Sequence, residues 1–282
     1  MKHPIIIGLV VLLMLTVVAC DQGASLRDAI ARAIAKTSEA HSYRSAGNVT
    51  TYTDSVTTVS SYEWECAAPD RYHSVSTTVV DDAGNVTTTT TVDHGNFTCI
   101  SSAPTSGGWF ETIVVGDKGY VRSQREPQWR VCEVYTPDSQ PPPGPTPGTG
   151  TCQVSIQTSD KQLELLNYLV ELEKLPDEEI DGVNCSHYRG RVDQDSVVDM
   201  LRKRDEEAYG QIPPEYLEMM RRQEIVIELW IDGDDYIRQQ RSEFRFPEPD
   251  STTGDEKWVT GFSTTRYFDF NEPISIEPPE IE

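Results

Sequence analysis

Cysteine is the residue type whose positions in this chain point most directly to chemistry. The sequence of 282 residues contains six cysteines. No two of them form a Cys-x-x-Cys pair, so a zinc knuckle or a thioredoxin-like redox motif has little support. Disulfides are the better interpretation if the chain is exported. The cysteines are Cys20, Cys66, Cys99, Cys132, Cys152 and Cys185.

Cys20 stands where an N-terminal apolar run ends. Lys2 supplies a positive charge, and the run from Pro4 to Val18 contains few polar residues. At about 1.5 Å per residue, this run is shorter than the roughly 30 Å hydrocarbon core of a bilayer. The pattern therefore predicts a signal peptide and not a permanent membrane span.

The residues around the end of this run resemble the lipobox of bacterial lipoprotein precursors. Val17-Val18-Ala19-Cys20 is followed by the polar Asp21-Gln22-Gly23. The resemblance implies cleavage before Cys20 and a lipid on its sulfur, with the membrane as partner; an ordinary secretory peptide ending near a cysteine is the alternative. Two or three acyl chains would anchor stably. We expect residues 1–19 to be a signal peptide and 20–24 a lipidated tether, which places the chain outside the cytoplasm.

The remaining cysteines allow disulfides. Cys132 and Cys152 bracket a Pro/Gly-rich loop at residues 137–150, and a bond between them would close it. In the chain-entropy model such a closure stabilises by roughly 3 kcal/mol. Cys66 and Cys99 form a second possible pair, which would leave Cys185 free.

Charge limits the partners of the chain. Lys and Arg number 24 against 46 Asp and Glu, which gives a net charge of −22. Nucleic-acid phosphates and anionic lipid surfaces would both repel such a chain. We therefore expect no nucleic-acid partner, and membrane contact through the anchor instead of a basic surface.

Motifs that would indicate an enzyme are missing from the sequence. It has no Gly-x-Ser-x-Gly elbow, no His-Glu-x-x-His and no phosphate-binding glycine loop. Asp232, Asp234 and Asp235 lack the downstream ligands of a calcium loop and are typical of a hairpin turn. We predict no enzymatic activity, no cofactor and no metal. The histidines of the mature chain are scattered: His41, His73, His94 and His187.

The elements that position these residues follow from the apolar periodicity. A helix should begin at Ser25 and end near His41. From Tyr43 to Tyr135, alternating Thr, Val and aromatic residues with intervening turn signals predict six or seven antiparallel strands joined as consecutive hairpins. The 137–150 loop lies inside the single domain expected for residues 25–282.

The C-terminal half should alternate helices and strands. A helix from Leu163 to Leu175, ended by Pro176, would carry two apolar stripes, of which Leu163, Leu166, Leu169 and Val170 are the candidates for lining a ligand cavity. Further elements are predicted as a strand at Val183–Val192, helices at Asp195–Tyr209 and from Pro214 to Met220, and strands at Glu224–Ile231, Tyr236–Phe246 and Trp258–Asn271.

With this order of elements, the chain resembles the superfamily of the lipoprotein carrier LolA, and more closely the mycobacterial lipoproteins of the LppX and LprG type. The motifs that carry the resemblance are Ala68-Pro69-Asp70-Arg71-Tyr72, Leu229-Trp230-Ile231-Asp232, and Tyr267 to Ile274 with Pro278. The resemblance implies an α+β fold: a curved antiparallel sheet, an unclosed half-barrel, wrapped around a few helices, with acyl chains on its concave side.

Two functions follow from this resemblance. The first is binding or carrying lipids or other hydrophobic molecules at the cell envelope. The second is a protein-binding sensor or regulatory module with the same half-barrel. The tryptophans, Trp64, Trp109, Trp129, Trp230 and Trp258, are compatible with a cavity lining, but core packing is their more ordinary role.

Overall fold

The computed structural model describes residues 25–53, 57–67, 71–81, 97–98, 108–135, 153–156, 163–209, 214–249 and 256–281. Cys20, the expected signal peptide and tether, and the Pro/Gly-rich loop lie outside these residues. Among the described helices, none has the length and apolar character needed to cross a membrane.

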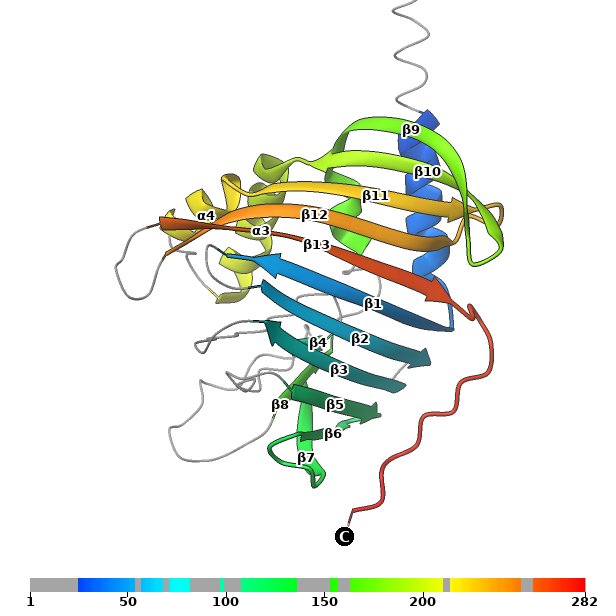
Figure 1. The fold of residues 1–282 in the computed structure, drawn as a ribbon, viewed down its shortest axis with the longest axis vertical. Helices are drawn as coiled ribbons and strands as arrows, with labels where there is room; N and C mark the ends of the chain where they lie inside the picture. Colours follow the sequence, from blue (N-terminus) through cyan, green and yellow to red (C-terminus); the bar gives the residue numbers. More distant parts are fainter. Residues whose placement is uncertain are drawn as a thin grey trace, which may run out of the picture.

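The described strands form a single curved sheet whose two edges do not meet (Figure 1). The strand order is β4-β8-β7-β6-β5-β3-β2-β1-β13-β12-β11-β10-β9. All neighbours pair antiparallel except β7 and β8, which are parallel. The predicted α+β half-barrel is confirmed. The strands are β1 Ser42–Tyr52, β2 Thr57–Ala67, β3 Arg71–Asp81, β4 Phe97–Thr98, β5 Gly108–Val115, β6 Lys118–Ser123, β7 Arg130–Tyr135, β8 Gln153–Ile156, β9 Leu169–Ile180, β10 Val183–Val192, β11 Glu224–Asp232, β12 Ile237–Pro249 and β13 Glu256–Phe268.

Strand connectivity differs from the predicted run of hairpins in one place. In the described parts of residues 42–135 there are seven strands, within the expected six or seven, but β3 pairs with β5 and not with β4. The short β4 instead pairs with β8 at the opposite edge of the sheet from β9. Turn residues mark where the chain reverses, but they do not specify which strand the chain returns to.

The predicted helix from Leu163 to Leu175 is wrong. In its place, a short 3₁₀ helix η1, Glu164–Tyr168, leads directly into β9. Val170 and Leu172 alternate with Glu171 and Glu173 in the sequence, so this segment carries a period of two as well as a helical period, and pairing with β10 decides between them. β9 is an edge strand, which is where a sheet tolerates proline, here Pro176.

Helices cover one face of the sheet, which we call the inward face (Figure 1). They are the N-terminal helix over residues 25–38, η1, and α3, Gln194–Tyr209, with α4, Pro214–Arg221, packed beside α3. Apolar side chains of the N-terminal helix, η1 and α3 join those of β1, β9, β10, β11, β12 and β13 in the main core. Burial of this apolar area is what holds the helices on the sheet. Its members include Ile30, Ala33, Tyr43, Leu166, Val197, Ile227, Leu229 and Tyr267.

A second, smaller core lies at the β3–β7 part of the sheet. It consists of Tyr72, Val114, Val121 and Cys132, with partly buried neighbours around them. Cys66 on β2 is partly buried and packs against both cores, so the two clusters adjoin on the inward face.

Candidate functional site

The four residues predicted to line an acyl-chain cavity lie at and just before the start of β9. Leu163, Leu166 and Leu169 are almost fully buried and pack in the main core, and Val170 is half-buried. These three leucines therefore pack within the protein core, which is the ordinary role of apolar side chains. The pocket described below is lined by other residues.

The expected pair between Cys66 and Cys99 is wrong, because Cys66 is a free thiol. Burial raises the pKa of the Cys66 thiol to about 12, although hydrogen bonds from Tyr43 and Tyr72 act in the opposite direction. The thiol is therefore committed to hydrogen bonds within the sheet. Cys185 is also a free, buried thiol.

Cys132 is disulfide-bonded, and its bonding partner lies outside the described residues. Cys20, Cys99 and Cys152 all lie outside them. The pairing of Cys132 with Cys152 therefore stays a prediction, as does the lipid on Cys20.

A pocket of about 430 Å³ lies between the beginning of the N-terminal helix and strands β9 and β10. Its lining is mostly polar and carries charges of both signs. Arg32 and Lys174 are cationic and Asp28 is anionic, while Leu26 and Ala29 add apolar surface. The remaining lining residues are Ser25 and Tyr188.

Small side chains cross the middle of the inward face. The strand registers align Thr78, Ser60, Val49, Ser263 and Ser242 in a row from β3 to β12, which we call the hydroxyl row. Ser60 and Ser263 are buried, and the hydroxyls of Ser60 and Thr78 are 3.0 Å apart.

Aromatic side chains flank the hydroxyl row on the same face. By register, Trp64 lies opposite Ser45, and Phe244 lies opposite Gly261. Both rings are only partly buried. An added Cβ at Gly261 would meet the Phe244 ring at 2.6 Å, so the glycine allows this ring to lie against the sheet.

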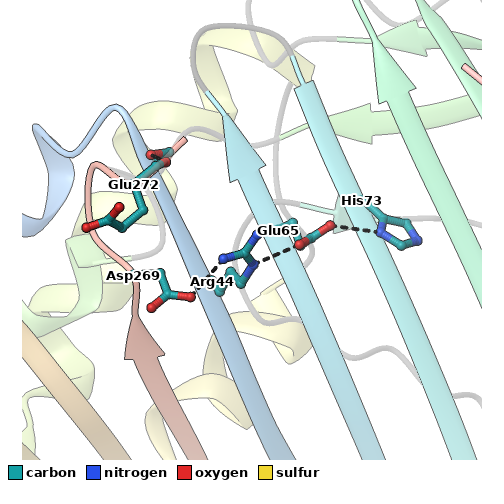
Figure 2. Close-up of polar contacts among 6 residues, drawn as sticks. Arg44, Glu65, His73, Asp269 and Glu272 are labelled. Atoms are coloured by element: carbon teal, nitrogen blue, oxygen red, sulfur yellow. Dashed lines mark hydrogen bonds and ion pairs between the residues drawn. The ribbon is translucent and has the colours of Figure 1, made fainter. Parts of the chain in front are cut away.

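On the opposite, outward face, a line of charged side chains crosses from the end of β13 to β6; we call it the charge ladder. Figure 2 shows the part of the ladder from Asp269 to His73. Arg44 donates to Asp269 and to Glu65, in both cases at 2.8 Å. Glu65 also faces His73 Nδ1 at 3.3 Å. The strand register brings these side chains together. Glu65 on β2 lies directly opposite Arg44 on β1 and directly opposite His73 on β3.

The ladder continues beyond His73. His73 Nε2 lies 2.9 Å from Glu111, and Glu111 accepts a hydrogen bond from Arg122. The Arg122 guanidinium in turn lies over the Trp129 ring, 4.4 Å from its centre. Both His73 nitrogens therefore face carboxylate oxygens, one on each neighbouring strand.

Hydrogen bonds within the ladder favour the charged forms of Glu65 and Arg44. Partial burial of Glu65 opposes ionisation, but hydrogen bonds from Arg44 and His73 outweigh it and lower the pKa of Glu65. The pKa of Arg44 is raised by its hydrogen bonds to Glu65 and Asp269. Because each carboxylate is engaged by neighbouring cations, the ladder is suited to holding strands together.

His187 occupies a different position on the outward face. Its ring stacks on Trp230 with centres 4.1 Å apart, and only 5% of the residue is exposed. Within the described part of the chain, neither ring nitrogen has a hydrogen-bond partner, and the nearest carboxylates, those of Glu178 and Glu228, are 3.8 Å away. Trp230 itself donates to Glu178 at 2.9 Å. The imidazole therefore serves as a stacking surface.

The charge ladder and the pocket were not foreseen from the sequence. A signal for the ladder was present, since charged residues stand next to inward aromatic or sulfur residues in Tyr43-Arg44, Glu65-Cys66 and Tyr72-His73. The pocket left no such signal, because its lining combines a helix with strands far away in sequence.

Several solved structures are similar to this fold. The Mycobacterium tuberculosis lipoprotein LppX is 15% identical, with 90% of this chain and 99% of that chain covered and a TM-score of 0.45. LprF from Mycobacterium bovis is 11% identical, with coverages of 91% and 97% and a TM-score of 0.46. A putative outer membrane lipoprotein-sorting protein domain from Vibrio parahaemolyticus is 9% identical, with coverages of 88% and 93% and a TM-score of 0.24.

LppX, which the sequence motifs resemble, is thus among the structural matches. No protein-family model and no curated protein sequence matches the chain. At these identities and TM-scores the solved structures assign no ligand to this chain.

Proposed function

We propose that the chain is an extracytoplasmic lipoprotein, anchored to a membrane through a lipid on Cys20, that binds a lipid or another hydrophobic molecule on the inward face of its half-barrel. The anchor is supported by the apolar run that ends in Val17-Val18-Ala19-Cys20. This part of the proposal places the domain beside the lipids that it would bind.

The single observation that carries the binding role is the hydroxyl row. A sheet face that only packs against helices fills its surface with large aliphatic side chains, as Ile227 and Leu229 do in the main core. The row from Thr78 to Ser242 has small side chains instead, between the partly buried rings of Trp64 and Phe244. A narrow apolar ligand would fit over small residues and contact the rings.

The energetic case is favourable for an acyl chain. Removing apolar surface from water contributes about 25 cal/mol per Å², so a chain that buries on the order of 200 Å² gains about 5 kcal/mol before ordering costs. Hydroxyls that already bond one another, as Ser60 and Thr78 do, lose little when the ligand displaces water.

The experiment is mass spectrometry of an organic extract of the full chain purified from a bacterial host. We expect copurifying lipid in the unmodified protein. Ser60→Leu should lower its occupancy severalfold, because the added side chain fills the hydroxyl row. Ser61→Leu is the matched control, since Ser61 is exposed on the other face of the same strand.

The opposite outcome of this experiment would contradict the binding role. If the extract contains no lipid, and Ser60→Leu lowers only the thermal stability, the inward face is a packed core and the binding role fails. Overpacking of such a core would cost about 1–3 kcal/mol.

A protein-binding role is the second candidate, and one outward feature favours it. The Trp258 ring lies between the guanidinium groups of Arg222 and Arg245, at 5.4 and 4.2 Å from its centre. Tryptophan and arginine are enriched in the centres of protein interfaces. The protein-binding role would be favoured over lipid binding by two results together. The unmodified chain would crosslink to an envelope protein that the Trp258→Ala variant does not capture, and the organic extract would contain no lipid.

A further inference from the structure

The pocket beside the N-terminal helix has the composition of a site for a zwitterionic phosphate ligand. Arg32 and Lys174 supply two cations, Asp28 supplies one anion, and Leu26 and Ala29 supply a small apolar floor. We propose that this pocket binds the headgroup of an aminophospholipid of the membrane to which the chain is anchored, with the phosphate on the two cations and the ammonium on Asp28.

The cations of the pocket are available to a ligand. Arg32 pairs with Asp235 at 3.4 Å and Lys174 with Asp177 at 3.1 Å, and in each pair both side chains are more than two-fifths exposed. Exposed pairs of this kind contribute little, so a phosphate can replace or share the carboxylate at small cost. Arginine with a phosphate forms a stronger, bidentate arrangement.

Asp28 determines which phosphate ligand fits best. It has no ion pair among the described residues and stands one helical turn before Arg32, so the two side chains are neighbours on the helix surface. A simple anion would meet this carboxylate unfavourably. A headgroup that carries a primary ammonium next to its phosphate satisfies both charges, and it also avoids the repulsion between an anionic lipid and a chain of net charge −22.

The position of the pocket suits a membrane ligand. Ser25 lines it and stands five residues after Cys20. Five extended residues span at most about 18 Å. The tether therefore allows the pocket to reach the headgroup layer and prevents it from moving far away. This step, and only this step, rests on the proposed lipid anchor.

The test is calorimetric titration of the full chain, purified in a non-ionic detergent, with dihexanoyl phosphatidylethanolamine. We expect saturable binding that the double variant Arg32→Gln/Lys174→Gln weakens about tenfold, because it removes both charge-assisted contacts. Asp28→Asn should weaken binding of this lipid but not of inorganic phosphate. Arg27→Gln is the matched control, because Arg27 is exposed on the same helix and does not line the pocket.

Three results would overturn the inference: no saturable binding, equal affinity in the double variant, or inorganic phosphate binding as tightly as the lipid. Since Arg32 and Lys174 are exposed, thermal melting should show that the variants remain folded. The titration does not require an acylated Cys20 or a ligand on the inward face. If the organic extract contains lipid but the titration shows no headgroup binding, the pocket inference fails and the proposed function is retained. If the titration shows headgroup binding but the extract contains no lipid, the proposed function fails and the pocket inference is retained.

Discussion

The hydroxyl of Tyr62 on β2 lies 2.6 Å from the hydroxyl of Thr265 on β13, although β1 runs between these two strands. The tyrosine ring crosses β1 at Gly47, where an added Cβ would approach the Tyr62 hydroxyl to 2.5 Å. Burial raises the pKa of Tyr62 to about 12, so the phenol stays protonated in neutral solution. A glycine thus allows one side chain to tie three strands together.

This relationship predicts that Gly47→Ala destabilises the fold. The new methyl group would also press on the backbone carbonyl of Thr264, which cannot move without disturbing the sheet. We expect a loss of about 1–3 kcal/mol in the free energy of unfolding, measured by chemical denaturation. Gly233→Ala is the control, since a Cβ there meets nothing within 4 Å. Equal stability of the two variants would contradict the packing of Tyr62 over β1.

The charge ladder predicts a pH-dependent contribution from Glu65. Its pKa is lower in the folded chain than in the unfolded one, so the folded state binds fewer protons around that pKa. The stabilisation is therefore present above the unfolded pKa and is lost as pH falls through the folded pKa. Glu65→Gln should cost about 1 kcal/mol at neutral pH and almost nothing in strong acid.

Denaturation curves from neutral pH down into the acid range would measure this difference. Glu63→Gln is the matched control, since Glu63 is exposed on the same face of β2 and has no ion pair in the described part of the chain. A pH-independent difference between Glu65→Gln and the unmodified protein would show that the ladder contributes only packing.

The partly buried thiol of Cys66 should be unreactive in the native protein. With its pKa raised to about 12 by burial, the thiolate fraction at mild alkaline pH is smaller than that of an ordinary cysteine by about a thousandfold. Iodoacetamide labelling followed by peptide mass analysis, with and without guanidinium, would measure the protection. Rapid labelling of the folded chain, or recovery of Cys66 in a disulfide, would be inconsistent with the structure.

We predict that the sulfur bonded to Cys132 is that of Cys152, because the two residues bracket the Pro/Gly-rich loop. Peptide mapping without reduction should recover the peptides of both cysteines as one species. Reduction should destabilise the chain by roughly 3 kcal/mol if the entropic model of loop closure holds. A bond between Cys132 and Cys99 would show that the loop is closed differently.

The lipid anchor predicts the behaviour of Cys20→Ser. Without the sulfur, no thioether can form, and the precursor should keep its N-terminal segment and remain heavier than the mature protein. Intact-mass measurement of both forms from a bacterial host would test this. An unmodified Cys20 in mature, membrane-bound protein would exclude a lipid on this residue.

Short-range patterns in the sequence determined a large part of this fold. The sequence predicts a strand near Val183–Val192, which is β10, and the cap and apolar spacing after Ser25 predict the helix over residues 25–38 within a few residues of its end. In these segments the apolar residues fit one period only, and tertiary contacts agree with it.

Tertiary structure alone decided the rest. The segment from Leu163 to Leu175 fits two periods, and pairing with β10 makes most of it a strand. Cys66 remains a thiol because its neighbours are tyrosines. The side chains of Arg44, Glu65 and His73 meet only because three strands pair in one register. The physical reason is the same in each case. Strand pairing joins residues far apart in sequence, and a shift of one residue would turn every side chain to the other face, so the partners are fixed only when the whole sheet has formed.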